Sequence, residues 1–554
     1  MTASAIPVDP AAKPEKLSET ARAANWLAGA AVILPFLQLI PLDFDRSAPL
    51  LLVPALWFGS HQLARGVSHL ARGPTWLRWA GTAAVIATVW AVILADQPAP
   101  ALVAAASWVL LAAGGVLAGQ LVHAQPGLSP RLLAGFALGA AAGTLATWFL
   151  WWNTGRNAMP LYANPRHLGL HLVGGVIAAT ALTVRPGITP GTRLGWFVVG
   201  CVTWGGMLWA GGRTPVVGVI AGMIAWTWQT QRDQRRRLLA CSASMVVVGI
   251  LLSAIFWSPR LEYGWWHMLS RTSAGISEGT ASSITTTRSD FWRETIQRAK
   301  AAPWLGHGPD SYRFLTPKLD GQQPHNVALQ LWLDLGVVGA LPALILLIGA
   351  LVVGARHHAP PAQPWIALLA VSCAAGMLDG VFYHMLASLP AILAVGICLG
   401  GGFWVPTKST PAFSGVAARV SVFLATVILL FHAWLFHQVA VAPPPGNSQQ
   451  AQARLLQWFP STTFGLWRWL DAWQTSEPAA PLAWARWAQT HSAYAPHFHI
   501  YAANCLLREN DRAGANRELQ AAWRKAHVSA KPSIEAMQKQ LGLAAGGPAV
   551  SLPP

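Results

Sequence analysis

Apolar windows of about twenty residues recur along most of this 554-residue chain, and they limit its possible folds more than any other feature. A helix of that length crosses the hydrocarbon core of a bilayer, and about thirteen such windows can be counted. They lie near residues 23–42, 47–65, 75–95, 100–122, 131–151, 168–185, 193–211, 214–229, 238–257, 326–355, 364–384, 386–405 and 416–440. Only 11% of the residues are charged, against roughly 25% in soluble domains. We therefore predict an all-α polytopic membrane protein with about 12–13 transmembrane helices.

The basic residues predict which loops share a side of the membrane. The net charge of +17 needs no nucleic-acid partner, because cytoplasmic loops of membrane proteins collect Lys and Arg. The strongest cluster, residues 231–237, is predicted to be cytoplasmic, and alternation places several other basic positions on that side. These are Arg65, Arg72, Arg131, Arg185, Arg193, Arg356 and Lys408. The bacterial inner membrane is the expected location, with the long loop and the C-terminal tail in the periplasm.

Five segments follow from this topology. They are a cytoplasmic N-terminal lead (1–22), an N-terminal transmembrane bundle (23–257), a long periplasmic catalytic loop (258–325), C-terminal transmembrane helices (326–440), and a Pro-rich hinge with a helical C-terminal domain (441–554). The five cysteines show neither disulfide nor metal-site spacing.

Several arginines fall on the side where the positive-inside rule does not expect them. Arg156 and Arg166 lie in the outer loop 153–167, Arg213 lies in a tight turn between two apolar windows, and Arg288 lies in the long loop. Each could anchor at lipid headgroups or pair with a carboxylate. Arg213 is the strongest functional candidate because glycines precede it and no acidic residue is near in sequence. Its planar guanidinium suits a diphosphate.

The long loop contains a second candidate arginine for binding an anion, Arg288. Residues 287–296 have helical character, which would place Arg288 near a helix start, where free backbone N–H groups favour an anion. Gly306 and Gly308 follow in a turn. They are a weak phosphate-loop signal, because no Lys-Ser or Lys-Thr follows them.

His325 closes the loop immediately before an apolar helix. A lone histidine is usually structural or a metal ligand, but a neutral imidazole at this position could accept a proton from an attacking sugar hydroxyl. No residues have zinc spacing. Asp43 and Asp45 have the spacing of a magnesium pair, but they lie in a short outer turn far from the loop in sequence. We predict no metal and no cofactor.

These residues together resemble a known family. The segments carrying the resemblance are Arg213-Thr214-Pro215, Arg288 to Gly308, His325 to Gly339 and Asn164 to Gly169. Over roughly residues 130–400 the chain is similar to the O-antigen ligase/polymerase superfamily. The resemblance implies a helical membrane bundle that transfers a glycan from undecaprenyl pyrophosphate to an acceptor hydroxyl, with inversion and without a metal.

The resemblance also implies residue roles. Arg213 and Arg288 would bind the donor pyrophosphate and stabilise the leaving diphosphate, and His325 would orient or deprotonate the acceptor. We further predict substrate-binding roles for Arg156, Asn164, Arg166, Arg293 and Asn326.

The acceptor is less constrained. Ligation to lipid A core is the first prediction. The alternatives are a protein O-oligosaccharyltransferase that modifies Ser or Thr of pilin-type proteins, and an O-antigen or exopolysaccharide polymerase. The tail 447–545 reads as amphipathic helices, with a tetratricopeptide-like pair over 495–522. Such a tail favours a protein acceptor, although it could equally cap the long loop.

A transporter or flippase for a lipid-linked glycan is the alternative from another class. It would share the apolar bulk and the misplaced arginines. Such a protein typically shows repeated halves with paired broken helices, and the sequence shows no such symmetry. The expected partners are therefore the lipid-linked donor, the lipid A core or protein acceptor, and membrane lipids.

Overall fold

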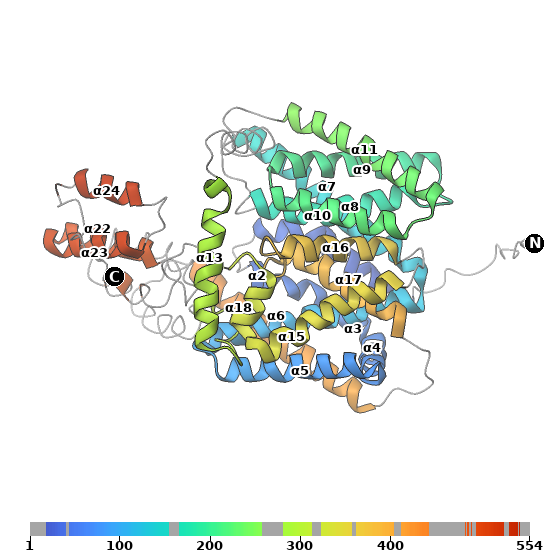
Figure 1. The fold of residues 1–554 in the computed structure, drawn as a ribbon, viewed down its shortest axis with the longest axis horizontal. Helices are drawn as coiled ribbons and strands as arrows, with labels where there is room; N and C mark the ends of the chain where they lie inside the picture. Colours follow the sequence, from blue (N-terminus) through green and yellow to red (C-terminus); the bar gives the residue numbers. More distant parts are fainter. Residues whose placement is uncertain are drawn as a thin grey trace, which may run out of the picture.

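The structure is a computed structural model in which every regular element described is a helix. It describes residues 18–39, 44–154, 165–256, 281–312, 323–356, 362–403, 412–441, 495–525 and 531–540, with positions 482, 485, 486, 489 and 542. Figure 1 shows the helices of the main body running roughly parallel to one another.

In chain order, the described helices are α1 (Glu19–Ile33), η1 (Leu34–Leu39), α2 (Phe44–Ser47), η2 (Ala48–Leu52), α3 (Val53–Phe58), α4 (Ser60–Arg72), α5 (Thr75–Ile93), α6 (Pro98–Ala124), η3 (Pro126–Leu128), α7 (Ser129–Thr154), α8 (Pro165–Val184), α9 (Pro190–Ala210), α10 (Arg213–Gln229), α11 (Arg232–Ile255), α13 (Ala281–Ala301), α15 (Val327–Arg356), α16 (Gln363–Gly376), α17 (Met385–Phe403), α18 (Ala412–Val441), α22 (Ala495–Arg508), α23 (Arg512–Lys525) and α24 (Lys531–Gln540).

The composition of these helices is that of a multi-pass membrane protein. Eight of the described helices are long and apolar enough to cross a bilayer, and α16 and α17 are shorter apolar helices. Large apolar side chains remain exposed on the outer helices, among them Trp79 on α5 and Phe423 on α18. An apolar surface of this extent is expected where lipid replaces water. Helix α8 instead lies in the interior, with most of its residues buried.

Three predicted helix windows are corrected by the structure. Window 47–65 is divided among η2, α3 and α4, because Pro49, Pro54 and Gly59 interrupt a regular helix. Helix α15 is broken at Gly336, where φ is 61°. Window 364–384 was expected to be one helix, but α16 ends at Gly376 and residues 377–384 form turns.

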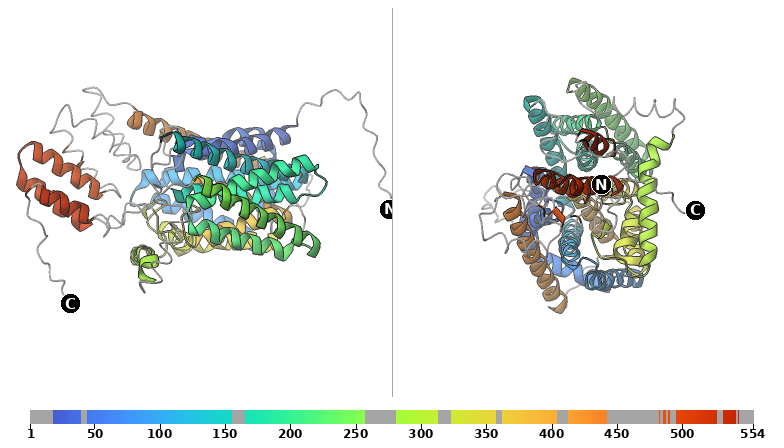
Figure 2. Two further views of the ribbon diagram at one scale, coloured as in Figure 1. Left: turned by 90° about the horizontal axis from the view of Figure 1, so that it is seen from above. Right: turned by 90° about the vertical axis from the view of Figure 1, so that its left-hand side faces the viewer.

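Helix α13 and the C-terminal helices all lie at one end of the helical body. At that end, α13 crosses the body roughly at right angles to the other helices, and α22 to α24 lie beyond that same end (Figures 1 and 2). Helices α22 and α23 pack as a hairpin joined at Asn510, which agrees with the predicted helix pair. The tetratricopeptide likeness stays a prediction.

Candidate active site

The turns between α16 and α17 carry the carboxylate around which a polar site is built. Asp379 is 5% exposed, and its Oδ1 accepts a hydrogen bond from the backbone N–H of Gly380 at 2.9 Å. Oδ1 also contacts Nδ1 of His325 at 2.8 Å. A buried carboxylate at the end of apolar helices is costly unless it is paired, and His325 provides the short contact.

His325 lies between the long loop and α15, as predicted. Its φ is 54°, a left-handed value that is uncommon outside glycine. The following residue fixes this geometry. Asn326 caps α15 by accepting from the N–H of Leu329 at 3.0 Å, and its Nδ2 donates to the carbonyl of Met377 at 3.1 Å. Asn326 thus joins the start of α15 to the turn that carries Asp379.

The protonation pattern of His325 follows from its partner. Burial raises the pKa of Asp379, but the hydrogen bond and charge of His325, the Gly380 N–H and the charge of Arg288 outweigh it. The resulting pKa is below the usual range, so the carboxylate is ionised and only accepts. Nδ1 of His325 must then carry the hydrogen. In the neutral ring this leaves Nε2 as a proton acceptor.

One predicted arginine, Arg288, lies beside this pair and contacts the residue that follows Arg213. The Nη2 atom of Arg288 lies 3.7 Å from Oδ2 of Asp379 and donates to Oγ1 of Thr214 at 3.4 Å. Thr214 follows Arg213, the first residue of α10, so Arg288 of α13 reaches the start of the helix that carries Arg213. Gly211 ends α9 with φ of 69°, which permits the abrupt turn before Arg213. Arg213 is exposed and has no ion pair within the described ranges.

Arg288 lies inside a helix, which corrects one prediction. Helix α13 begins at Ala281, so the polar residues before Arg288 are helical and free backbone N–H groups cannot assist it. The inner face of α13 packs Phe291 and Ala299 against Leu333 of α15 and Tyr312. The ring of Phe291 also contacts that of His325, with centroids 5.6 Å apart. The packing of α13 therefore sets the position of Arg288.

The turn after α13 attaches it to the break in α15. The N–H of His307 donates to the carbonyl of Leu333 at 2.8 Å, and that of Gly308 donates to Asp334 at 3.0 Å. The backbone of Gly306 packs directly on residues 334–336. Gly306 and Gly308, weak candidates for a phosphate loop, are therefore used in packing.

A second histidine cluster adjoins the first. His384 contacts Oδ2 of Asp45 through Nδ1 at 3.1 Å, and its Nε2 contacts Nε2 of Gln323 at 2.8 Å. The ring of His167 lies 3.8 Å away, centroid to centroid. Burial raises the pKa of Asp45, but His384 and His167 outweigh this and lower it to about 2. Helix α2, which carries Asp45 and is far from the long loop in sequence, is thus part of this end.

A buried ion pair fixes the same turns together. Nη2 of Arg46 donates to Oδ1 of Asp310 at 2.7 Å, and both side chains are almost completely buried. The guanidinium carbon lies 4.7 Å from the ring centre of Tyr383. One arginine therefore links α2, the segment after α13, and the α16–α17 turns.

The other predicted substrate-binding residues are not brought to this site by the described structure. Arg293 is exposed on α13, about 140° around the helix from Arg288 at 100° per residue. Arg156 and Asn164 lie outside the described residues, as does the side chain of Arg166. Within the described residues no group of three His, Cys, Asp or Glu side chains could hold a metal ion. The metal-independent route remains a prediction.

Sequence reasoning overlooked Asp379, His384, Thr214 and Gln323. The first two had a detectable signal, because a charged residue within an apolar window is a functional candidate by default. Window 364–384 contained both, and it was interpreted as one helix. Thr214 and Gln323 carried no comparable signal beyond their adjacency to Arg213 and His325.

A comparison with protein families matches one segment of the chain. A family described as O-antigen ligase matches residues 197–344, a range that contains Arg213, Arg288, His325 and Asn326. Asp379 and His384 lie beyond the matched range. No match was found among curated proteins. Residues 197–344 are therefore similar to the O-antigen ligase family.

Proposed function

We propose that the protein transfers a glycan from an undecaprenyl-pyrophosphate-linked donor to an acceptor hydroxyl at the periplasmic face of the inner membrane. The family implies a glycosyltransferase-type enzyme that uses lipid-linked glycans. The observation that carries the proposal is the His325–Asp379 pair, 2.8 Å apart, beside Arg288, which in turn contacts Thr214 next to Arg213. A proton acceptor and two permanent positive charges are the groups that this transfer requires.

The arginines bind the donor diphosphate in this proposal. Arg213 is exposed, and Arg288, whose side chain is 32% exposed, approaches Asp379 at 3.7 Å and donates to Thr214 at 3.4 Å. Their guanidinium groups can therefore be redirected to phosphate oxygens. As the sugar–phosphate bond breaks, negative charge grows on the diphosphate, and two fixed cations stabilise that charge more in the transition state than in the ground state.

His325 receives the proton. The acceptor oxygen attacks the anomeric carbon of the donor sugar while its hydrogen passes to Nε2. The bond from that carbon to the diphosphate oxygen breaks, and undecaprenyl diphosphate leaves with the electron pair. A single displacement of this kind inverts the anomeric centre. The ionised Asp379 stabilises the imidazolium that forms.

Asp379 and Asn326 are positioning residues in this scheme. Both ends of the Asn326 amide are bonded within the protein, so it orients His325 from the neighbouring position. The second cluster, His384 with Asp45 and Gln323, adjoins the pair and lies close enough to orient the acceptor sugar.

Ligation to lipid A core is the proposed reaction, supported by the family description. The helical hairpin of α22 and α23 beyond the same end favours the alternative of a protein Ser or Thr acceptor, while polymerisation of a lipid-linked glycan needs no further element. Deleting the gene distinguishes the three, because lipopolysaccharide, a glycoprotein or polymer length would be the species that loses glycan.

Replacement of two residues tests the activity itself. With purified protein, lipid-linked donor and acceptor, we expect Arg288→Ala and His325→Ala each to lower kcat by about 10²–10⁴-fold. Arg298→Ala is the matched control. Arg298 lies on the same helix as Arg288, and its ion pair is with Glu294 of that helix, away from His325 and Asp379. Normal transfer by both site variants would contradict the proposal. Movement of the donor across vesicles without covalent transfer would indicate the transporter instead.

A further inference from the structure

A cavity lies at the opposite end of the helical body from His325. It has a volume of about 980 Å³ and is lined by residues of η3, α7, α8, α9, α10, α11 and the start of α16. Volumes of about 300–1,000 Å³ are usual for ligand sites. Its position follows from the helices: α10 begins with Arg213 at the candidate active site and reaches this cavity near Thr230.

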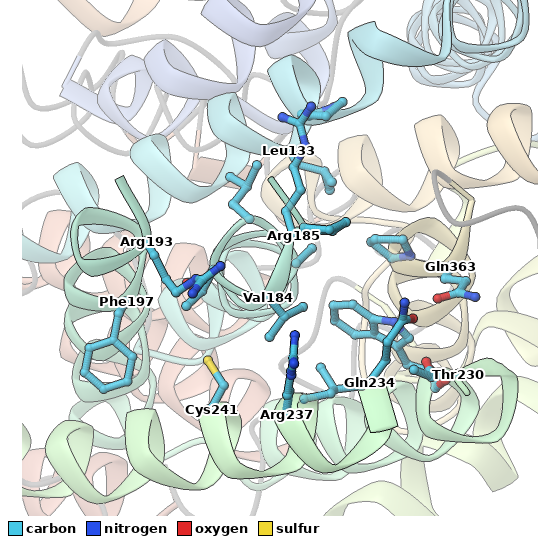
Figure 3. Close-up of a pocket in the computed structure, with 18 of the residues that line it drawn as sticks. Leu133, Val184, Arg185, Arg193, Phe197, Thr230, Gln234, Arg237, Cys241 and Gln363 are labelled. Carbon is cyan, nitrogen blue, oxygen red and sulfur yellow. Dashed lines mark hydrogen bonds between the residues drawn. The ribbon is translucent and has the colours of Figure 1, made fainter. Parts of the chain in front are cut away.

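The cavity combines positive charge with apolar walls. Arg193 of α9 and Arg237 of α11 point into the space between their helices (Figure 3). Arg185 also lines it, and the described lining includes no carboxylate. None of the three arginines has an ion pair within the described ranges. The deeper wall is formed by apolar side chains, among them Leu133, Leu182, Phe197 and Trp226.

The positive-inside rule explains why these arginines are on this side, but not why they surround one cavity. Charges that only set topology need no common position. Two guanidinium groups over an apolar cavity match a ligand with an anionic head and a hydrocarbon body. Basic pockets between transmembrane helices are known to bind anionic lipid headgroups.

We propose that this cavity binds an anionic phospholipid. Arg193 and Arg237 hold the phosphodiester, with Arg185 beside them, and an acyl chain lies against Phe197 and Leu182. The occupant would pack between α9 and α11. The opposite end of α9, at Ala210, adjoins the turn that precedes Arg213. This site is separate from the one that performs transfer.

Lipid titration of the full-length protein in detergent, followed by native mass spectrometry, tests the proposal. The ligands are phosphatidylglycerol, phosphatidylcholine and glycerol 3-phosphate, and the variant is Arg193→Gln/Arg237→Gln. Two arginines near an anionic lipid correspond to about a 30-fold loss of phosphatidylglycerol affinity. Arg232→Gln/Arg236→Gln removes the same charge from α11 positions outside the cavity, and we expect less than about a threefold change.

The outcomes are distinct. Stronger binding of phosphatidylglycerol than of the other two ligands, lost only in the cavity variant, supports the site. Equal binding of phosphatidylcholine, or an equal loss in the control variant, would overturn it. Equal binding of glycerol 3-phosphate would show that the apolar wall does not contribute, and would also overturn the proposal.

A phosphatidylglycerol with a photoreactive acyl chain gives a second readout in the unaltered protein. Labelling around Phe197 or Cys241 is expected, and labelling confined to other helices would refute the proposal.

Discussion

The sharpest test of the candidate active site is Asp379→Asn. This change keeps the shape of the side chain but removes its charge. The contact between Asp379 and His325 is 2.8 Å long and partly buried, and a hydrogen bond to a charged group contributes about 1.5–3 kcal/mol. If this stabilisation is required as His325 becomes positive in the transition state, kcat falls by about 10- to 150-fold.

The effect on donor binding should be much smaller. Arg288 lies 3.7 Å from Asp379, and its side chain is 32% exposed, so this contact adds little. We therefore expect the KM for the donor to change by less than about threefold. A role limited to stability would lower the amount of folded enzyme without separating kcat from KM. Transfer would be measured with purified protein and a lipid-linked donor, with kcat normalised to folded protein.

The chain contains a matched control. Asp96 accepts from Nδ1 of His307 at 2.9 Å, so it forms the same kind of contact at the same end of the helical body, but its side chain is 55% exposed. Asp96→Asn should leave kcat within about twofold of the unaltered protein, as expected for an exposed pair. If Asp379→Asn retained full kcat, or lost no more than Asp96→Asn, the positioning role of Asp379 would be refuted.

Three further predictions concern stability. Arg46→Met removes the charged partner of the buried Asp310 and should destabilise the protein by about 3–5 kcal/mol in denaturant titration; a loss below about 1 kcal/mol would contradict the buried ion pair. Asn326→Ala removes the cap of α15 and should lower the free energy of unfolding by about 1 kcal/mol. Asn326→Gly should lower it less, because glycine is a better N-cap residue than alanine. The pKa of Asp45 is lowered from 3.8 to about 2, so its stabilising contribution is present above pH 4 and is lost as pH falls toward 2. The difference in Tm between the unaltered protein and Asp45→Asn should therefore narrow over that interval, and a constant difference would contradict the lowered pKa.

Most of the helices could be predicted because span length is a local property. Windows such as 100–122 and 131–151 correspond closely to α6 and α7. Prediction failed where hydropathy and backbone preference disagree. Residues 47–65 are apolar enough for a helix but contain two prolines, and residues 377–384 are apolar on average but form turns around buried polar groups. A hydropathy average records neither interruption.

The candidate site was only half predictable. The sequence alone pointed to Arg213, Arg288 and His325. Each is a basic or titratable residue on the predicted outer side of the membrane, where the positive-inside rule does not expect arginine. Their partners could not be assigned, since Asp379 is separated from His325 by 54 positions and from Arg288 by still more. Such pairings depend on the packing of α13 and α15 against the α16–α17 turns. No periodicity in the sequence encodes that packing.

The two arginine–aspartate contacts at this end show why one of them suits binding. Arg46 and Asp310 are 2.7 Å apart and almost fully buried, so separating them would leave buried charges without their main partner. Arg288 and Asp379 are 3.7 Å apart, and the arginine side chain is 32% exposed. Asp379 keeps its short contacts with His325 and Gly380 when Arg288 turns away. The carboxylate that orients His325 can therefore stay in place when Arg288 exchanges its 3.7 Å approach to Asp379 for a contact with the diphosphate.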